Sequence, residues 1–259
     1  MTVSYKLEDG VAVLTLDDVP RHNALSRVMI AELNRWHARS IRDGARAIVL
    51  GANGPSFCAG ANIDDLRSGW MEGGDPETDP LHFFRRLATD RRVTIAAVQG
   101  TAAGGGLELT LACDLVIAGE RATFLAPELG HGVIPPLGIA LLPHIVGRHR
   151  AMDMVLTRRK IGAEEAVRIG LATHGVEVDD VISSAVALAR SIVDKIPPGA
   201  LGVAKQQLSH HQALDWPSIL TCSGGVPTAE WREGLDAFME KRRPDYDQFW
   251  NKSDKENHS

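Results

Sequence analysis

The sequence predicts an α/β fold in which most strands run parallel. Short, continuous apolar runs at 47–50, 94–98 and 115–118 have the composition of strands that are buried on both faces of a sheet. Loops and helical patterns separate these runs, as in a chain that alternates strands and helices. Beyond Gly147 the apolar spacing becomes mostly helical. We therefore expect an α/β unit followed by a helical C-terminal region.

The composition excludes several classes of function. The chain has 259 residues, of which 44% are hydrophobic and 24% charged, as expected for one large globular domain, alone or with a small appendage. The formal net charge of −5 argues against general nucleic-acid affinity, because no basic excess exists to neutralise phosphates. A small anionic ligand needs only a few local cations and is not excluded. No apolar run approaches the length that a membrane span needs.

Cysteine and histidine usage predicts neither disulfides nor a metal site. Cys58, Cys113 and Cys222 are far apart and form no C-x-x-C pair, which favours free thiols in a reducing compartment. The histidines form no H-E-x-x-H motif, so no metal is expected. Residues 1–7 lack the basic and apolar regions of a signal peptide. The expected location is cytoplasmic.

The first elements follow from local signals near the N-terminus. Val3–Leu7 and Val11–Leu16 flank an Asp-Gly turn and predict a β-hairpin. Ser26 is a suitable N-cap for a helix that runs through Ile41. The apolar stripe of this helix, which we assign to the core rather than to a binding face, comprises Met29, Ile30, Leu33 and Trp36.

The middle of the chain is expected to contain long loops. Residues 53–62 form a predicted loop, and the polar sequence after it is expected to be irregular through Pro80. Within that stretch, 69–79 is rich in Gly, Asp, Glu and Pro and predicts a mobile surface loop. A helix is predicted at about 81–90.

The second half is expected to be mainly helical. The strand at 94–98 runs into a glycine-rich stretch, and a short helix around 107–111 follows. The polar tail after Trp250 is expected to be disordered. The later predicted helices lie at 149–158, 163–169, 179–195, 199–212 and 227–241.

Three consecutive glycines, Gly104 to Gly106, follow a predicted buried strand. Inside a strand or helix each glycine costs roughly 1 kcal/mol relative to alanine, so a turn is the better interpretation. A turn that exposes backbone N–H groups at a helix N-terminus makes a site for developing negative charge. Tight packing of strand against helix is the alternative. No Lys-Ser or Lys-Thr follows the glycines, and neither G-x-G-x-x-G nor G-x-S-x-G supports a dinucleotide site or a serine nucleophile.

A second glycine-bearing loop, 57–62, also follows a strand and precedes a helix. In a parallel α/β arrangement two such loops lie at the same carboxyl edge of the sheet, where ligands bind. Each loop can supply one backbone donor to the same oxygen. Removing one such donor costs roughly 2.7–4 kcal/mol in well-studied oxyanion holes.

Two glutamates have apolar neighbours that suit proton transfer. Glu108 lies among leucines at 107, 109 and 111, and Glu128 lies between a proline and a leucine. Desolvation raises the pKa of a glutamate, which brings it closer to neutral pH. Taken singly, each residue also fits a helix cap or a solvated side chain.

Together these segments resemble the enoyl-CoA hydratase (crotonase) superfamily over nearly the whole chain. The C-terminal stretch 232–242 is similar to the last helix of that family. The order and spacing of the motifs carry the resemblance more than any one of them. The five other stretches that match are 21–25, 56–61, 96–100, 104–109 and 122–128.

The resemblance implies a fold and a domain organisation. The expected fold is the crotonase-like (ClpP/crotonase) spiral of ββα units with a C-terminal helical region. The core domain would cover 1–198, and a helical trimerisation region with a polar tail would cover 199–259. Members of the family form homotrimers, often paired into hexamers, and we expect the same of this chain.

The resemblance also implies the activity of an enoyl-CoA hydratase. Water would add syn across the 2,3-double bond of an acyl-CoA thioester, or leave in the reverse dehydration. The backbone N–H groups of Ala61 and Gly105 would form the oxyanion hole for the thioester carbonyl. Glu108 would help to activate water for attack at C3, and Glu128 would hold that water and deliver a proton to C2. No cofactor is implied beyond the coenzyme A that the substrate carries.

Contacts with the substrate are implied at two further sets of residues. Lys241, whose other interpretation is a solvated charge, matches a lysine that reaches the nucleotide of coenzyme A. The remaining predicted coenzyme A contacts are Arg21, Ala24, Ala59 and Ile63. The predicted substrate pocket comprises Leu66, His131, Pro136 and Leu137.

The chain departs from the hydratase pattern in ways that leave the acyl group open. Asn62 replaces an aspartate, which bears on loop anchoring rather than chemistry. The segment 131–142 lacks the usual glycine-rich run, and Pro136 removes a backbone donor there. This segment is faintly similar to carbon–carbon bond hydrolases, with His131 or His144 as a further acid–base group. Isomerisation, decarboxylation or hydrolysis of a cyclic or branched substrate is therefore the alternative, and a non-catalytic acyl-CoA-binding protein is a third.

Overall fold

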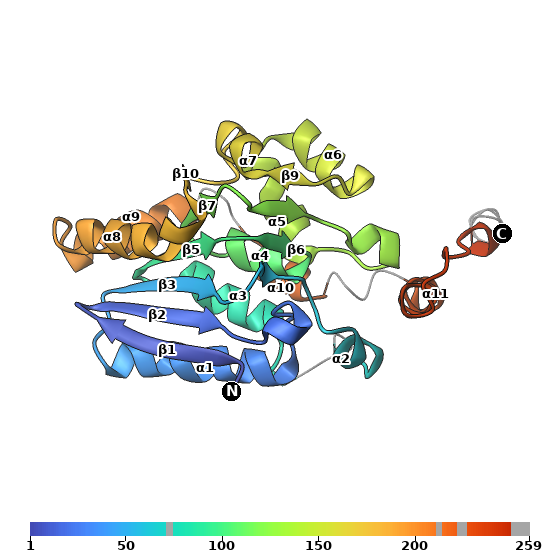
Figure 1. The fold of residues 1–259 in the computed structure, drawn as a ribbon, viewed down its shortest axis with the longest axis horizontal. Coiled ribbons are helices and arrows are strands. Elements are labelled where there is room, and N and C mark those ends of the chain that lie inside the picture. The colour runs from blue at the N-terminus through green and yellow to red at the C-terminus, as the bar shows by residue number, and fades with distance from the viewer. Residues whose placement is uncertain (71–74, 211–213, 222–226, 250–259) are drawn as a thin grey trace.

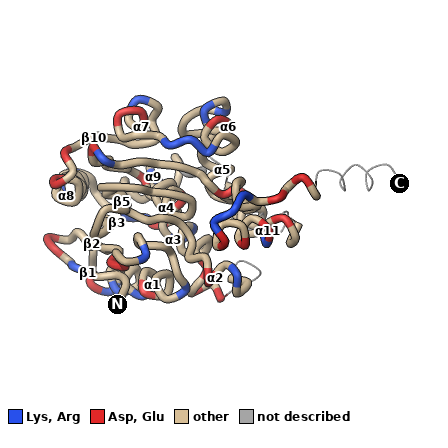
Figure 2. The backbone as a smooth tube through the Cα atoms, turned by 45° about the vertical axis from the view of Figure 1, so that its right-hand side comes forward, with Lys and Arg blue, Asp and Glu red and all other residues tan. Residues whose placement is uncertain are grey.

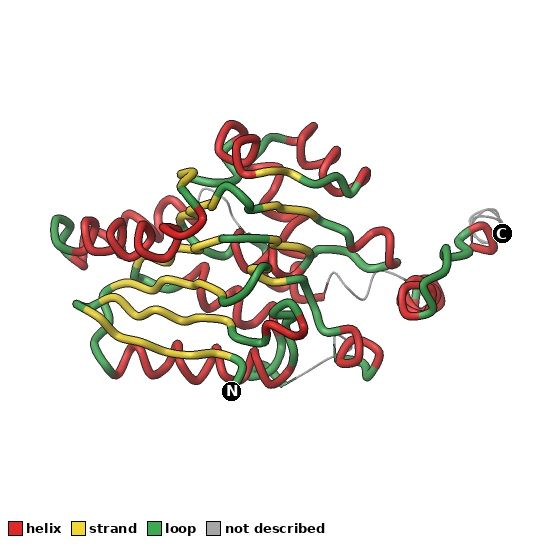
Figure 3. Tube along the Cα trace, in the orientation of Figure 1, coloured by secondary structure: helices red, strands yellow, loops and turns green. Residues whose placement is uncertain are grey.

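The computed structural model describes residues 1–70, 75–210, 214–221 and 227–249. The tail after Trp250, part of the loop expected at 69–79 and the end of the helix expected at 199–212 lie outside the described residues. Strands form the centre of the molecule and helices surround them (Figure 3).

The main sheet has six strands in the order β1-β2-β3-β5-β7-β10 (Figure 1). The first two strands form the expected antiparallel hairpin, and every other neighbouring pair is parallel. All residues of β3 and β5 are buried, as parallel strands covered on both faces require. The five predicted strands of this sheet are confirmed, with bounds β1 Val3–Glu8, β2 Val11–Leu16, β3 Ala47–Ala52, β5 Val93–Val98 and β7 Leu115–Gly119. The sixth strand, β10 His174–Val176, was not predicted and lies in the part of the chain that was expected to be mostly helical.

A second sheet of four very short strands was not predicted. The loop expected at 53–62 and the glycine-rich stretch after β5 each contain a strand of this sheet, and these two strands pair in parallel. Strands of two or three residues are too short to show an alternating pattern, which is why the sequence did not reveal them. The strands, in the order β4-β6-β8-β9, are β4 Ser56–Cys58, β6 Thr101–Ala103, β8 Thr123–Leu125 and β9 Ile161–Gly162.

Helices cover both faces of the main sheet. On one face the core includes α1 (Arg27–Arg42), with Met29, Ile30 and Leu33 fully buried. Ser26 caps this helix by accepting a bond from the N–H of Met29, as expected. On the other face Val181, Ala185 and Ala189 of α8 (Val181–Val193) pack against alternate residues of the strands. The alternation of buried residues along each strand thus divides the core into two layers.

The other helices confirm most of the expected ones. The exceptions are α5 and α10, which were not predicted, whereas α2 is the helix expected directly after the glycine-bearing loop at 57–62. In α5 two prolines obscure the helical pattern. Trp70, at the start of the predicted surface loop, is instead fully buried and donates a hydrogen bond to the Thr78 carbonyl. The bounds are α2 Ile63–Arg67, α3 Pro80–Thr89, α4 Gly105–Leu111, α5 Pro136–Ile145, α6 Arg148–Thr157, α7 Ala163–Ile169, α9 Pro198–His210, α10 Trp216–Thr221 and α11 Thr228–Met239.

Three short 3₁₀ turns complete the fold: η1 Val19–Arg21, η2 Glu128–His131 and η3 Val178–Asp180. Charges of both signs lie along α11 and the segment that follows it (Figure 2). In the described part of the chain, none of the helices combines the length and the apolar composition needed to cross a bilayer.

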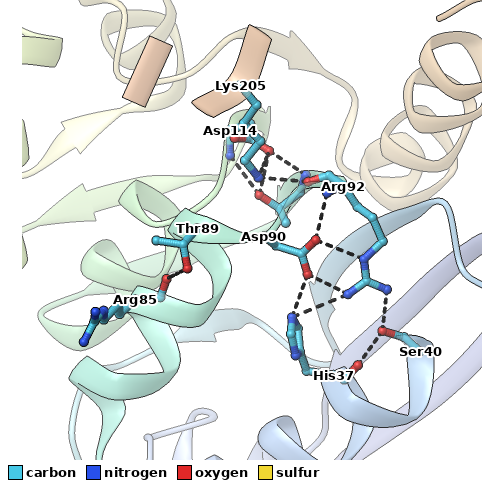
Figure 4. A network of polar contacts seen from close by, with 9 residues as sticks. His37, Ser40, Arg85, Thr89, Asp90, Arg92, Asp114 and Lys205 are labelled. Atoms are coloured by element: carbon cyan, nitrogen blue, oxygen red, sulfur yellow. Dashed lines mark hydrogen bonds and ion pairs between the residues drawn. The ribbon is translucent and has the colours of Figure 1, made fainter. Parts of the chain in front are cut away.

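A buried polar network pins helices to the amino ends of β5 and β7 (Figure 4). Lys205 of α9 bonds to a carboxylate oxygen of Asp114 at 2.7 Å and to the carbonyl of Arg92 at 2.8 Å. Asp90 accepts bonds from Arg92 and lies 2.8 Å from a ring nitrogen of His37 on α1. Burial alone would raise the pKa of Asp90, but His37 and Arg92 hold it well below its usual range.

We predict that Lys205→Met destabilises the protein by roughly 2 kcal/mol, because it removes the cation from the Asp114 carboxylate, whose side chain is 25% exposed, so that the cost lies between those of a surface pair and a buried pair. Lys6→Met is the matched control, since Lys6 pairs with Glu8 on the surface and should contribute less than about 1 kcal/mol. Denaturant unfolding of both variants measures the difference. Equal free energies of unfolding for the two variants would contradict the assignment.

Candidate active site

Two glycine turns at the carboxyl ends of β4 and β6 lie in backbone contact. Gly60 has φ +106°, and a side-chain carbon added to it would lie 3.1 Å from the Ala103 carbonyl oxygen. A side-chain carbon on Gly106 would overlap the Cys58 carbonyl. Only glycine permits this approach, so the expected convergence of the two loops is present. It is set by the parallel pairing of β4 with β6 rather than by the main sheet.

The two turns bring two unused backbone donors together. A parallel bridge joins Leu25 to Ala61 through the Gly60 carbonyl and the Asn62 N–H, at 2.7 and 2.6 Å, which leaves the Ala61 N–H outside the bridge. Gly105 is the first residue of α4, so its N–H has no acceptor within the helix. Neither N–H finds an acceptor among the described residues. A side-chain carbon on Gly105 would lie 3.8 Å from the Ala61 nitrogen, so the two donors are neighbours.

Glu108 lies in the first turn of α4 with 6% of its surface exposed. Its Oε1 atom accepts hydrogen bonds from the N–H groups of Leu137, at 2.7 Å, and Gly138, at 3.1 Å. Both donors belong to the N-terminus of α5, which favours negative charge. Burial raises the pKa of Glu108 to about 7 although these two N–H groups oppose the rise.

Glu128 begins η2 and lies against the glycine turn. Both of its carboxylate oxygens are buried, and neither has a hydrogen-bond partner among the described residues. A side-chain carbon on Gly104 would lie 3.2 Å from its Oε1 atom. Burial and then the nearby charge of Glu108 raise the pKa of Glu128 to about 8. The two glutamates are therefore close enough to interact, and only Glu108 has donors to stabilise its charge.

Pro136, which was expected to remove a backbone donor from the site, lies at the N-terminus of α5. It occupies the first position of α5, where an N–H would have no partner within the helix. The next two residues, Leu137 and Gly138, supply the N–H groups that bind Glu108. The proline therefore starts the helix that holds this carboxylate.

The other predicted contact residues lie on the loops and helices around the glycine turns. Arg21 and Ala59 are exposed, and Arg21 pairs with Asp18 at 3.3 Å. Ala24 is half-buried in the loop beside them. Lys241 is exposed just after α11.

Ile63 and Leu66 are half-buried on α2, which α11 contacts. A cavity of about 220 Å³ between these two helices is lined by two arginines that no sequence motif marked. It is lined by Arg67, Trp231, Arg232, Leu235 and Asp236.

Neither of the two candidate histidines, His131 and His144, hydrogen-bonds to Glu108 or Glu128 within the described residues. His131 is half-buried on η2 and packs edge-on against Phe238 of α11, with 5.0 Å between ring centres. Burial and then Arg158 lower its pKa. His144 is exposed on α5. No group of three or more His, Cys, Asp or Glu side chains within the described residues is arranged to hold a metal ion.

Two asparagines fix the loops of the site. Asn62 caps α2 by accepting bonds from the N–H groups of Asp64 and Asp65, which fits the expected role in loop anchoring. Asn23 was missed, although it is fully buried with φ +55°. Its side chain bonds to the N–H of Asp18 and to the carbonyls of residues 53 and 56, and so ties the loop at 21–25 to β4. An asparagine is one of the few residues that adopt positive φ readily, and this was the available signal.

Comparisons with known proteins agree with this architecture. Residues 6–251 match the family described as "Enoyl-CoA hydratase/isomerase". A "Probable enoyl-CoA hydratase" from Rhodobacter capsulatus is 36% identical, covering 95% of this chain and 97% of that protein. A "Short-chain-enoyl-CoA hydratase" from Clostridium acetobutylicum is 32% identical over 91% of this chain and 94% of that protein.

Solved structures give the same result. The crystal structure of an enoyl-CoA hydratase/isomerase from Pseudoalteromonas atlantica matches with a TM-score of 0.85 and 30% identity, over 95% of this chain and 99% of that one. The fold is therefore that of the crotonase superfamily, as expected. The chain belongs to the enoyl-CoA hydratase/isomerase family.

We predict that Glu128→Gln gains stability relative to the wild type as pH rises, because of the environment of Glu128. The folded protein holds this proton to a higher pH than the unfolded chain, so wild-type stability falls as pH rises from about 4.5 to about 8. The variant escapes that loss, and its advantage should grow by at most about 1.4 kcal/mol per pH unit. Unfolding in denaturant between pH 5 and 9 measures it.

Glu32→Gln is the control of opposite sign. Burial alone would raise the pKa of Glu32, but the N–H groups of Thr2 and Val3 lower it. This variant should be less stable than the wild type near neutral pH, and the gap should close as pH falls below about 4.5. A Glu128→Gln curve parallel to that of the wild type would contradict the environment described for Glu128.

Proposed function

We propose that this protein is an enoyl-CoA hydratase, which adds water syn across the 2,3-double bond of an acyl-CoA thioester and catalyses the reverse dehydration. One observation carries the proposal. Two buried carboxyl groups with different hydrogen-bond environments interact beside a pair of unused backbone N–H groups. The relatives named above bear the same activity in their names.

The unused N–H groups of Ala61 and Gly105 are proposed to bind the thioester oxygen. Addition of water at C3 moves negative charge onto this oxygen as an enolate forms. Two fixed donors stabilise that charge without reorganising at the moment of reaction. The glycines around them keep side chains away, so the substrate carbonyl can approach the backbone.

Glu108 is proposed to be the base. The N–H groups of Leu137 and Gly138 stabilise its anionic form, and the α5 N-terminus adds to the effect. As a carboxylate, Glu108 accepts a proton from the water that attacks C3.

Glu128 is proposed to be the acid. Without donors, and close to the negative charge of Glu108, its carboxyl group retains a proton at neutral pH. It delivers this proton to C2 of the enolate, and the roles reverse in dehydration. Hydration leaves Glu108 protonated and Glu128 ionised, and passage of that proton from Glu108 to Glu128 restores the starting state. No cofactor is needed beyond the coenzyme A of the substrate.

Coenzyme A is proposed to bind across the loops and helices around the glycine turns. The residues proposed to contact it are Arg21, Ala24, Ala59, Ile63 and Lys241. The cavity between α2 and α11 also holds Arg67 and Arg232; Arg67 pairs with Asp236 at 3.2 Å, which leaves Arg232 as the cation proposed to attract the phosphates despite the net charge of −5. The acyl group is proposed to contact Leu66, His131, Pro136 and Leu137.

The reaction of an isomerase, decarboxylase or carbon–carbon bond hydrolase is not favoured. For that alternative, His131 or His144 was the candidate for an additional acid–base group. His144 is exposed, and His131 packs against Phe238. The paired glutamates and the named relatives instead support hydration.

Self-association and location remain proposals of the same kind. We propose a homotrimer or a hexamer built of two trimers, with a core at 1–198 and contacts from 199–259. Val203 and Leu208 on α9 support this, because they are large apolar side chains exposed to solvent in the single chain. A cytoplasmic location is supported by the free thiols of Cys58 and Cys113.

We predict that Glu108→Gln and Glu128→Gln each lower kcat for hydration of crotonyl-CoA or a longer enoyl-CoA by about 10²- to 10⁴-fold, with a small change in KM. Each variant loses one proton-transfer group and keeps the shape of the side chain. The loss of the enoyl absorbance measures the rate. Glu120→Gln is the control and should keep wild-type activity, because Glu120 is exposed and lies directly after β7. Turnover that survives in both active-site variants would refute the proposal.

We also predict a bell-shaped dependence of kcat/KM on pH, with its optimum between about 7 and about 8. The rate should fall on the acid side as Glu108 becomes protonated, and on the alkaline side as Glu128 loses its proton. Initial rates in a series of buffers at constant ionic strength measure the profile. A profile that is flat from pH 5 to 9 is the contrary result.

A further inference from the structure

The turn η2, which carries Glu128, is not held in place by burial of its own side chains. None of its four residues is fully buried, and no side chain caps it. Its internal bonds include Val133 N–H to the Glu128 carbonyl at 3.1 Å. A glutamate with two unpartnered buried oxygens nevertheless needs a fixed position, because nothing else orients its carboxyl group. The restraint must come from segments that pack on the turn.

Two distant side chains meet at Gly130, in the middle of this turn. The hydroxyl of Tyr246 donates a hydrogen bond to the Gly130 carbonyl at 3.1 Å. The guanidinium of Arg158 lies against the α-carbon of Gly130 and occupies the space that a side chain on Gly130 would need. Gly130 is thus held between a residue after α6 and a residue after α11.

The backbone of α11 approaches the same turn through glycines. A side-chain carbon on Gly132 would lie 2.6 Å from the Glu230 carbonyl, and one on Gly234 would lie 2.5 Å from the Tyr246 hydroxyl and would overlap the His131 carbonyl. Such contact leaves no room for the turn to shift toward α11. The hydroxyl of Tyr246 therefore sits in the seam between α11 and η2.

Glu233 holds Tyr246 in this seam. Its carboxylate accepts two bonds from Arg242 and one from the N–H of Asp245, the residue before the tyrosine. The segment after α11 is thereby folded back along the helix. A continuous set of contacts runs from Glu233 through Tyr246 to Gly130, two residues from Glu128.

We propose that Tyr246 is a positioning residue for Glu128: by clamping Gly130, it keeps the carboxyl group of Glu128 on the glycine turn. The C-terminal segment is then part of the catalytic apparatus without touching the substrate. This inference rests on the proposed function for its effect on rate, but its effect on the carboxyl group is independent of that function.

The charged groups around the turn are distributed over three elements. Glu108 faces Glu128 from α4, and Arg158 lies against Gly130 from the end of α6. The pKa of Tyr246 is raised first by burial and then by Glu233 and Glu230 of α11, whereas Arg158 lowers it. If the clamp loosens, water reaches Glu128, and the pKa of Glu128 moves down toward its ordinary value.

The test is Tyr246→Phe in the full chain, which removes one hydroxyl and keeps the ring. The matched control is Tyr5→Phe, because Tyr5 is the other tyrosine of the chain and its hydroxyl also makes a 3.1 Å hydrogen bond, to Asp43 at the C-terminus of α1 beside the edge strand β1. We expect kcat for enoyl-CoA hydration to fall about three- to tenfold with Tyr246→Phe at unchanged KM. The alkaline limb of the pH profile should move to lower pH while the acid limb stays. Tyr5→Phe should change neither.

A readout without substrate separates the clamp from the proposed function. In denaturant unfolding, wild-type stability should fall between pH 5 and 8 because of Glu128, and this fall should be shallower in Tyr246→Phe but not in Tyr5→Phe. Glu233→Gln should act in the same direction as Tyr246→Phe, and the two changes together should be less than additive. If the wild type hydrates no enoyl-CoA, the proposed function fails and the stability readout still decides the clamp. An unchanged alkaline limb together with an unchanged pH dependence of stability in Tyr246→Phe overturns it.

Discussion

The backbone contact between the turns after β4 and β6 is the constraint on which the site depends. Gly60, Gly104 and Gly106 allow two chain segments to approach more closely than any side chain would permit. The approach leaves the N–H groups of Ala61 and Gly105 side by side and unused. It also starts α4, which places Glu108, and offers the surface on which Glu128 lies. The pairing of β4 with β6 in the short second sheet brings the two turns into this contact. The six-stranded sheet and its two helical layers support it.

An asymmetry between two buried carboxyl groups then defines the chemistry. Burial penalises charge on both, but the N-terminus of α5 compensates only Glu108. A protein selected for stability alone would not bury a carboxyl group such as Glu128 without partners. The free-energy cost of burying this carboxyl group falls on Glu128 alone and is offset by the packing of the rest of the core, as is common at functional sites. Because no donor among the described residues bonds to the Glu128 side chain, its position depends on the backbone of η2. The C-terminal helix α11 contributes to the site by packing on that turn.

Local signals predicted five of the six strands of the main sheet and most helices, and the family resemblance singled out the two glutamates. Apolar runs marked β3, β5 and β7, and the apolar neighbours of Glu108 marked a carboxylate with a perturbed pKa. The short strands of the second sheet left none, since two or three residues show no period. The donors to Glu108 are backbone groups of α5, and backbone groups carry no residue-type signature. The contact of Tyr246 with Gly130 spans 116 positions and depends on the packing of α11.

The central claim is that Glu128 carries the proton of the pair at neutral pH while Glu108 is ionised. Infrared difference spectroscopy of the full chain at pH 7 tests this most directly, because a protonated carboxyl group has a carbonyl stretch distinct from that of a carboxylate. The account predicts a protonated-carboxyl band in the wild type that loses most of its intensity in Glu128→Gln, because Glu128 holds more of the proton than Glu108 does. A wild-type protein without this band, or a band that persists unchanged in Glu128→Gln, would contradict it.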